Sequence, residues 1–245
     1  MQIQEHTLEV WGDFGCWTRP ELKSERFSYP CCTPSGARGI FDAIFCKPHN
    51  HRTNDEGSAE FRWGITRIEI LDHPPSYIAL RRNEVGEVAS SRNVEQWMGG
   101  KRAAPMMADD PAIRQQRQTM ALRDVRFRIT GRIVPWAGHE RSQSAFDDQF
   151  IRRASHGKCF MQPYLGCREF VAFFKYLAPD ELRCAAFDWS SDLGMMVYDV
   201  FDLSAPGRNT SRPFVSLFHA KVEHGVLGVP GWRDPRVLKP EGSAA

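Results

Sequence analysis

Two groups of residues have types and spacings suited to chemistry, and the first is a run of cysteines and small residues. The stretch SYPCCTPSGARGIFDAIFCKP, residues 28–48, places adjacent cysteines and Ser35-Gly36-Ala37 directly before Arg38. Three interpretations are open: zinc ligands, a helix start whose free N–H groups bind a phosphate, and a tightly packed turn. Arg38 adds a fork of charged donors that suits a phosphate.

The cysteine spacing argues against a metal. The seven cysteines include no C-x-x-C pair, and adjacent Cys31 and Cys32 cannot easily both turn toward one tetrahedral ion. The letters HNH at residues 49–51 lack the ββα setting that a metal-dependent nuclease of that name needs. We therefore predict free, packed thiols, no metal site and no cofactor.

The second group consists of basic residues interleaved with aromatic residues. From Arg81 to Arg128 there are ten Lys or Arg against six Asp or Glu, and residues 150–168 hold four basic residues and no acid. Phe27, Tyr29 and Phe160 lie among such residues. Basic groups bind phosphates and aromatic rings stack on bases, so the pattern is compatible with binding of single-stranded nucleic acid. A solvated charged surface over core aromatic residues is the other interpretation.

The charge of the whole molecule gives little help, because the formal net charge is only +2. A polyanionic partner would therefore have to be bound by local clusters of positive charge. The basic residues that are candidates for contacting a nucleic acid are Lys23, Arg26, Arg38, Lys47, Arg81, Arg82, Arg114, Arg117, Arg152, Arg153, Lys158 and Arg168.

Length and composition describe an ordinary globular chain. With 245 residues, of which 42% are hydrophobic and 25% charged, it is long enough to bury a sizeable core. No segment approaches the ~18 uninterrupted apolar residues of a membrane span. The first residues also lack the basic and apolar regions of a secretory signal. These features predict a cytoplasmic protein with no membrane partner.

Hydrophobic periodicity predicts the elements that must position these side chains. Apolar residues at three- and four-residue spacing predict helices from residue 36 and over 145–156, with Ser35 or Thr33 capping the first. The second helix is expected to hold acids in its first turn and arginines near its end. Alternating apolar residues predict strands at 6–12, 62–71, 125–134, 167–177, 194–203, 213–223 and 225–228.

The order of these elements predicts an α+β fold. Strand, helix, strand, strand, helix, strand is the βαββαβ arrangement of a ferredoxin-like (RRM-like) domain, which we assign to residues 1–178. A polar insertion at about 83–120 is too long for an ordinary connection. A C-terminal antiparallel β-strand region is expected at 179–238, and a disordered tail at 239–245.

Three stretches resemble one protein family. They are VWGDFGCWTRPELKSERFSYPCCTPSGARGIFDAIFCKP at residues 10–48, RRNEV at 81–85 and GKCFMQPYLGCREF at 157–170. In this order they are similar to the Cas-five subunit of type I-C CRISPR effector complexes (d subtype), a member of the repeat-associated (RAMP) superfamily. The resemblance covers nearly all of the chain and is weakest in the insertion and the tail.

The resemblance implies a subunit of the Cascade effector complex. Family members bind the repeat-derived 5′ handle of CRISPR RNA, cap one end of the complex, and contact its large subunit and first backbone subunit. The insertion is then a protruding thumb, and contact with target DNA is indirect. Members in type I-C systems also cut the precursor RNA without a metal: the ribose 2′-hydroxyl attacks the neighbouring phosphate and leaves a cyclic phosphate. That reaction needs a base, an acid and a cation.

At its expected catalytic positions the sequence departs from the family. A Tyr or His is usual at the end of the first helix, where this chain has Phe45. A Lys-His pair is usual at the start of the second, where it has Ala145 and Phe146. Phenyl and methyl groups move no protons, and general acid–base help is worth roughly 10²–10⁴ in rate.

Substitutes for these groups lie nearby in the sequence. His139 precedes the second helix, Lys47 follows the first, and Tyr29 is a weaker third candidate. Two hypotheses follow from this departure. Either the protein is a processing endoribonuclease whose catalytic residues lie at other positions, or it is a binding-only scaffold whose RNA is cut by another ribonuclease.

Overall fold

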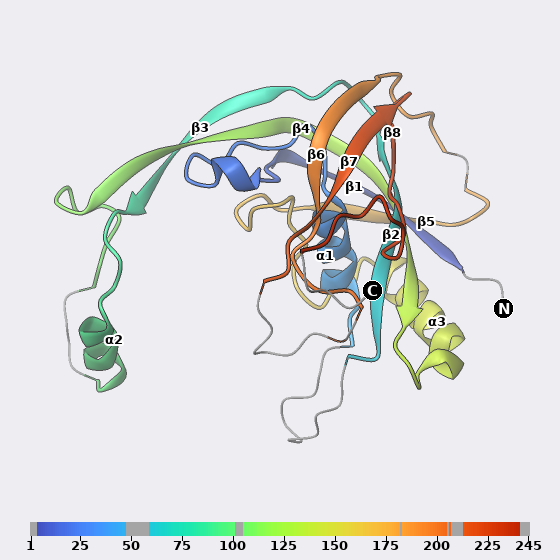
Figure 1. The fold of residues 1–245 in the computed structure, drawn as a ribbon, viewed down its shortest axis with the longest axis horizontal. Helices are drawn as coiled ribbons and strands as arrows, with labels where there is room; N and C mark the ends of the chain where they lie inside the picture. The colour runs from blue at the N-terminus through green and yellow to red at the C-terminus, as the bar shows by residue number, and fades with distance from the viewer. Residues whose placement is uncertain are drawn as a thin grey trace.

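The structure is a computed structural model that describes residues 4–47, 59–100, 105–181, 183–204, 206 and 213–240. In this part of the chain an eight-stranded antiparallel sheet bears α1 and α3 on one face (Figure 1). The elements are β1 (Glu5–Gly15), α1 (Pro34–Ile44), β2 (Phe61–Ile70), β3 (Tyr77–Val85), α2 (Ser91–Met98), β4 (Arg114–Pro135), α3 (Gln143–Ala154), β5 (Phe173–Leu177), β6 (Ser191–Asp199), β7 (Ser216–Glu223) and β8 (Val226–Gly228).

The predicted ferredoxin-like fold is confirmed by the strand order. The sheet begins β5-β1-β4-β2, so β4 lies between the two strands that α1 connects. All three pairings are antiparallel, with Leu8 opposite Ile129 and Val10 opposite both Phe127 and Phe174. The two βαβ halves therefore interlock, which is the βαββαβ arrangement expected from the sequence.

One predicted strand is shorter than expected. The pattern at residues 167–177 predicts a single strand, but β5 begins only at Phe173. The residues before it close a loop in which Leu165 N donates to Phe170 O over 2.7 Å. Apolar spacing in this loop comes from packing against the end of β1, where Cys16 N donates to Leu165 O over 2.9 Å.

The start of α1 is a packed turn. Thr33 is the N-cap residue and accepts a hydrogen bond from Gly36 N over 3.1 Å, so the alternative cap Ser35 is wrong. A Cβ at Gly36 would collide with Trp17 Nε1, which shows that the indole covers this end of the helix. Cys31 and Cys32 are fully buried, and burial raises the pKa of the Cys31 thiol to about 12. The turn is therefore built for packing.

Two glycines of α1 provide a test of this interpretation. Gly36→Ala is expected to lower the free energy of unfolding by about 1–3 kcal/mol, because the new methyl group overpacks against Trp17. A Cβ at Gly39 would meet no heavy atom within 4 Å, so Gly39→Ala is expected to raise it by about 0.5–1 kcal/mol. Urea denaturation of both variants measures the difference, and equal effects would contradict the close packing of Trp17 on Gly36.

The core lies between the sheet and the two helices. Phe41 of α1, Trp63 of β2 and Phe150 of α3 are fully buried, with both helix rings 4.6 Å from the indole of Trp63. The predicted apolar stripe of α3, which includes Phe150 and Ala154, faces this core. Aromatic packing of this kind fixes how the helix ends sit against the sheet.

The polar insertion is a thumb built from a long hairpin. β3 pairs with the first part of β4 from Tyr77 opposite Leu122 to Val85 opposite Arg114, and α2 lies at the far end (Figure 1). The sequence predicted neither β3 nor α2. Both faces of this hairpin largely meet solvent, and α2 has no buried residue, so no apolar periodicity marks them.

The C-terminal strands continue the same sheet. β8 pairs with β2, then β7 with β8 and β6 with β7, so the expected antiparallel region joins the ferredoxin-like part edge to edge. A boundary at residue 178 therefore separates two parts of one sheet, and the division into a ferredoxin-like domain and a C-terminal region stays a prediction. Residues 241–245 of the expected disordered tail lie outside the described residues. No described helix is long and apolar enough to cross a membrane.

Candidate functional site

One end of the molecule joins the segments that carry two of the candidate catalytic residues. Glu60 N donates to Lys47 O over 3.2 Å, Trp136 N donates to Glu60 O over 3.0 Å, and His139 N donates to Trp136 O over 3.0 Å. Lys47 Nζ lies 4.0 Å from a carboxylate oxygen of Glu60. The chain therefore brings Lys47 and His139 to the same end, beyond α1 and just before α3.

The positions that the family resemblance marks as catalytic hold an aromatic cluster. The ring centroid of Phe61 lies 5.2 Å from that of Phe45 and 5.0 Å from that of Phe146. Phe45 and Phe146 are 3% and 4% exposed, whereas Ala145 is exposed. Two of the three positions thus belong to the core, and none of the three side chains can transfer a proton.

A buried polar pair beside this cluster has no counterpart in the sequence analysis. His6 Nε2 of β1 lies 2.7 Å from Asp147 Oδ1 of α3, and Gln143 Nε2 donates to Asp147 Oδ2 over 2.9 Å. The helix begins at Gln143, so the expectation of acids in its first turn is wrong. Asp147 instead fixes α3 to β1, and no local pattern signals a partner so distant in sequence.

Tyr29 lies inside the protein. Its side chain is buried, its hydroxyl donates to Met195 O over 3.3 Å, and the Arg19 guanidinium lies 4.5 Å from its ring. Burial raises the pKa of this hydroxyl. The structure therefore shows Tyr29 packed between the first strand and β6, and a catalytic role for it stays a prediction.

Arg38 forms ion pairs that the sequence did not predict. Its Nε and Nη2 donate to both carboxylate oxygens of Asp199 over 2.7 and 3.0 Å, and its Nη1 donates to Asp42 over 2.7 Å. Burial alone would lower the pKa of this guanidinium, but the two carboxylates raise it above its ordinary value. Arg38 therefore joins α1 to β6 through donors that are occupied inside the protein, and a contact between Arg38 and RNA stays a prediction.

Several other candidate cations are engaged in ion pairs. Arg26 contacts Glu84 and Glu169, Arg82 contacts Glu84, and Arg117 contacts Glu25. Because exposed ion pairs are weak, their residues can still exchange a carboxylate for a phosphate. The other candidates have no carboxylate within ion-pair distance among the described residues: Lys23, Arg81, Arg114, Arg152, Arg153, Lys158 and Arg168.

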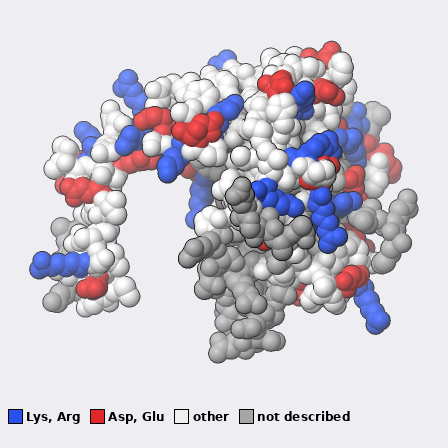
Figure 2. Space-filling view, viewed as in Figure 1, with Lys and Arg blue, Asp and Glu red and all other residues white. Residues whose placement is uncertain are grey.

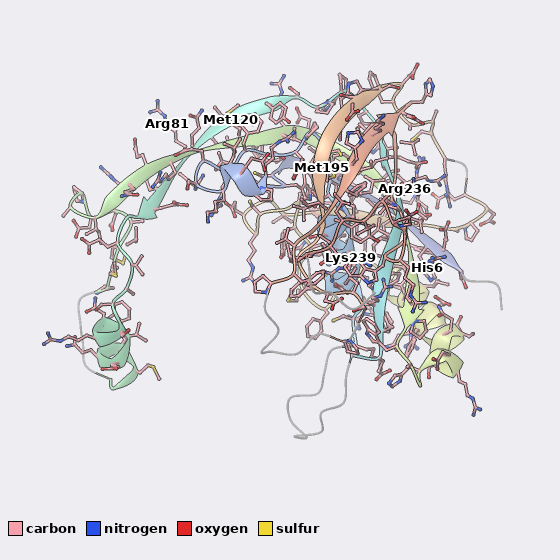
Figure 3. The ribbon with its side chains drawn as sticks, in the orientation of Figure 1. His6, Arg81, Met120, Met195, Arg236 and Lys239 are labelled. Atoms are coloured by element: carbon pink, nitrogen blue, oxygen red, sulfur yellow. The ribbon has the colours of Figure 1, made fainter. Side chains whose placement is uncertain are left out.

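These candidate cations do not form one continuous surface. Arg81 projects from the thumb (Figure 3), and Arg114 lies on the paired strand β4 of the same ribbon, opposite Val85. Arg152 and Arg153 lie on α3, on the other side of the body (Figure 1). Arg153 Nε donates to Ile44 O over 2.9 Å and so caps the end of α1. The basic clusters seen in the sequence lie on different segments, and the fold places those segments on different sides of the molecule.

The described residues contain no group of three or more His, Cys, Asp or Glu side chains arranged to hold a metal ion. His139 is half-buried in the turn before α3, and Lys47 is partly exposed after α1. A nitrogen base and an ammonium cation are two of the three groups that phosphodiester transfer needs.

An antiparallel ferredoxin-like sheet that carries a hairpin thumb and a C-terminal meander is the architecture of the RAMP class. Residues 7–230 match the model of the family described as CRISPR-associated protein (Cas_Cas5), and the chain belongs to this family in its type I-C form. It is 34% identical over 229 residues to the CRISPR pre-crRNA endoribonuclease Cas5d of Mannheimia succiniciproducens, covering 91% of this chain and 93% of that one. It is 35% identical over 235 residues to the protein of the same name from Thermus thermophilus, covering 91% and 90%.

Solved structures share the fold at low sequence identity. A crystal structure of a CRISPR-associated protein superposes with a TM-score of 0.62 at 15% identity, covering 94% of this chain and 95% of that chain. A functionally uncharacterized protein from Streptococcus mutans superposes with a TM-score of 0.58 at 16% identity, covering 93% of both chains. These likenesses support the RAMP architecture.

Proposed function

We propose that this protein binds the repeat-derived 5′ handle of CRISPR RNA as a subunit of a type I-C effector complex. The observation that carries the proposal is the similarity, over 91% of the chain, to proteins named pre-crRNA endoribonucleases. The backbone and large subunits are its proposed protein partners, and target DNA is reached only through the assembled complex. The thumb, which projects from the body, is the element suited to reach a neighbouring subunit (Figure 1).

We further propose that any cleavage of the repeat takes place at the end of the molecule that holds both Lys47 and His139. His139 takes the proton of the ribose 2′-hydroxyl, the 2′-oxygen bonds to phosphorus, and the bond from phosphorus to the 5′-oxygen breaks. The leaving 5′-oxygen receives a proton from solvent or from His139, and the ammonium of Lys47 stabilises the charge on the phosphate oxygens. The shared location of these two residues favours this assignment over one at Phe45, Ala145 and Phe146.

Incubation of the purified protein with its own repeat RNA in EDTA tests this proposal. We expect the cut to persist, because no step above uses a metal. His139→Ala should slow it at least about tenfold, below the usual range for general acid–base catalysis. His156, an exposed histidine bonded to Arg152 O beyond α3, provides the matched control, and His156→Ala should cut at the wild-type rate. Tight handle binding without any cut would favour the binding-only scaffold.

A further inference from the structure

A wide basic groove lies between the body of the sheet and the C-terminal segment. The groove has a volume of about 1320 Å³, larger than the ~300–1,000 Å³ of small-molecule pockets. Lys and Arg side chains gather on this face of the body (Figure 2), and Lys239, labelled in Figure 3, belongs to the C-terminal side of the groove. The basic residues that line the groove are Arg62, Arg132, Arg233 and Lys239.

The basic side chains of this groove have no carboxylate partner within ion-pair distance among the residues that the structure describes. Of the two acids that line it, Glu140 accepts a hydrogen bond from Gly138 N over 2.9 Å. The other, Asp234, is held by Arg236 over 2.7 Å, which lowers the pKa of that carboxyl to about 2. The groove therefore presents a positive field to solvent.

Two donors in the groove have no acceptor in the described part of the chain. Arg62 Nε and Trp136 Nε1 are both buried and unpartnered, and the Arg62 guanidinium lies 5.7 Å from the Trp136 ring. Burial and the neighbouring cations Arg38 and Arg132 lower the pKa of Arg62. A partly buried cation held among other cations is stabilised by an anion, so this cluster favours a phosphate.

Aromatic side chains complete the groove. Tyr198 and Trp232 are buried beneath it, and Lys239 Nζ lies 4.5 Å from the centroid of Trp232. Trp136 is half-buried, so part of its ring remains open for contact. Since His139 N donates to Trp136 O, the groove leads directly to the proposed catalytic end. Cations along a groove with an aromatic ring among them are the features that bind single-stranded nucleic acid.

We propose that this groove binds a single-stranded segment of RNA, with phosphates on Arg62, Arg132 and the rim cations, and a base against Trp136. The inference rests on the proposed function and adds the surface on which the RNA lies. A duplex fits poorly, because a stacked A-form helix offers no base face to Trp136.

Photocrosslinking tests the location directly. A short oligouridylate carrying 4-thiouridine is bound to the full chain, irradiated, and the crosslinked peptides are identified by mass spectrometry. We expect peptides that contain Trp136 or residues 229–239. Crosslinks confined to the thumb or to α3 would overturn the groove while leaving RNA binding intact. Failure of the wild-type chain to bind either this probe or its repeat RNA would overturn the proposed function as well.

Affinity measurements test the individual cations. Arg62→Gln and Arg132→Gln are each expected to raise the Kd for the oligouridylate about tenfold. Each should also reduce the slope of the logarithm of the binding constant against the logarithm of the salt concentration by about 1, which corresponds to one lost phosphate contact. Arg233 lies at the exposed rim, so Arg233→Gln is expected to raise the Kd equally without disturbing the packing. This variant therefore tests whether the groove binds RNA even if the Arg62 variant does not fold. Arg67 lies on the same strand as Arg62 outside the groove, and Arg67→Gln should leave the Kd unchanged.

A competition experiment separates RNA from a protein partner. Unlabelled oligouridylate is expected to displace the labelled probe from the wild-type chain, and polyglutamate of similar charge is expected to be a much weaker competitor, because it cannot stack on Trp136. Equal displacement by both, together with wild-type affinity in all three groove variants, would overturn the inference.

Discussion

Arg38→Ala is expected to unfold the protein at much lower denaturant concentration, with the free energy of unfolding lowered by about 3–5 kcal/mol. The substitution leaves the Asp199 carboxylate, which is 2% exposed, without its bidentate guanidinium partner. The same guanidinium joins α1 to β6, so the C-terminal meander also loses its tie to the helix. Urea denaturation followed by circular dichroism measures the loss, and the folded fraction should bind RNA with wild-type affinity.

Two comparisons control this prediction. Asp42 is the other partner of Arg38, but its side chain is 33% exposed, so Asp42→Ala should cost only about 0.5 kcal/mol. Arg152→Ala removes an exposed arginine of α3 and should leave stability unchanged. If Arg38→Ala melts like the wild type and binds RNA weakly, the residue contacts RNA and its pairing with Asp199 is dispensable.

The second large effect concerns the two residues at the family's Lys-His position. Phe146→His is expected to lower the free energy of unfolding by about 3–5 kcal/mol, the range measured when a buried phenyl group is lost. The ring packs on Phe61 inside the core, and an imidazole there would leave polar nitrogens buried. Ala145→Lys, one residue earlier and exposed, should change stability by less than about 0.5 kcal/mol.

The double variant Ala145→Lys with Phe146→His therefore should not restore the family's chemistry. We expect no gain in cleavage of repeat RNA, because the introduced histidine faces the core and weakens α3. The measurement is single-turnover cleavage in EDTA beside a denaturation curve of the same sample. A double variant that is as stable as the wild type and cuts faster would show that this end of α3 can present both side chains to the phosphate.

The α+β architecture was predictable because its strands and helices have one apolar face each. β1, the last part of β4 and α3 show clear periodicity, and their order alone limits the fold to a split βαβ pair. β3 and α2 were missed because both lie in the solvent-exposed thumb, where burial imposes no pattern. The position of β8 beside β2 was also invisible, since strand neighbours far apart in sequence are chosen by tertiary packing.

The sequence by itself determined the family, the local basic character of the chain, and side chains without a transferable proton at Phe45, Ala145 and Phe146, where the resemblance predicts catalytic groups. Only the tertiary structure decided which cations face solvent. Arg38 pairs with Asp199, 161 residues away in the sequence, whereas Arg62 and Arg132, which the sequence did not single out, line one groove and pair with no carboxylate in the described part of the chain. The physical reason is that a charge in a sequence has no partner until the chain folds. Whether an arginine holds the protein together or binds a phosphate depends on that partner.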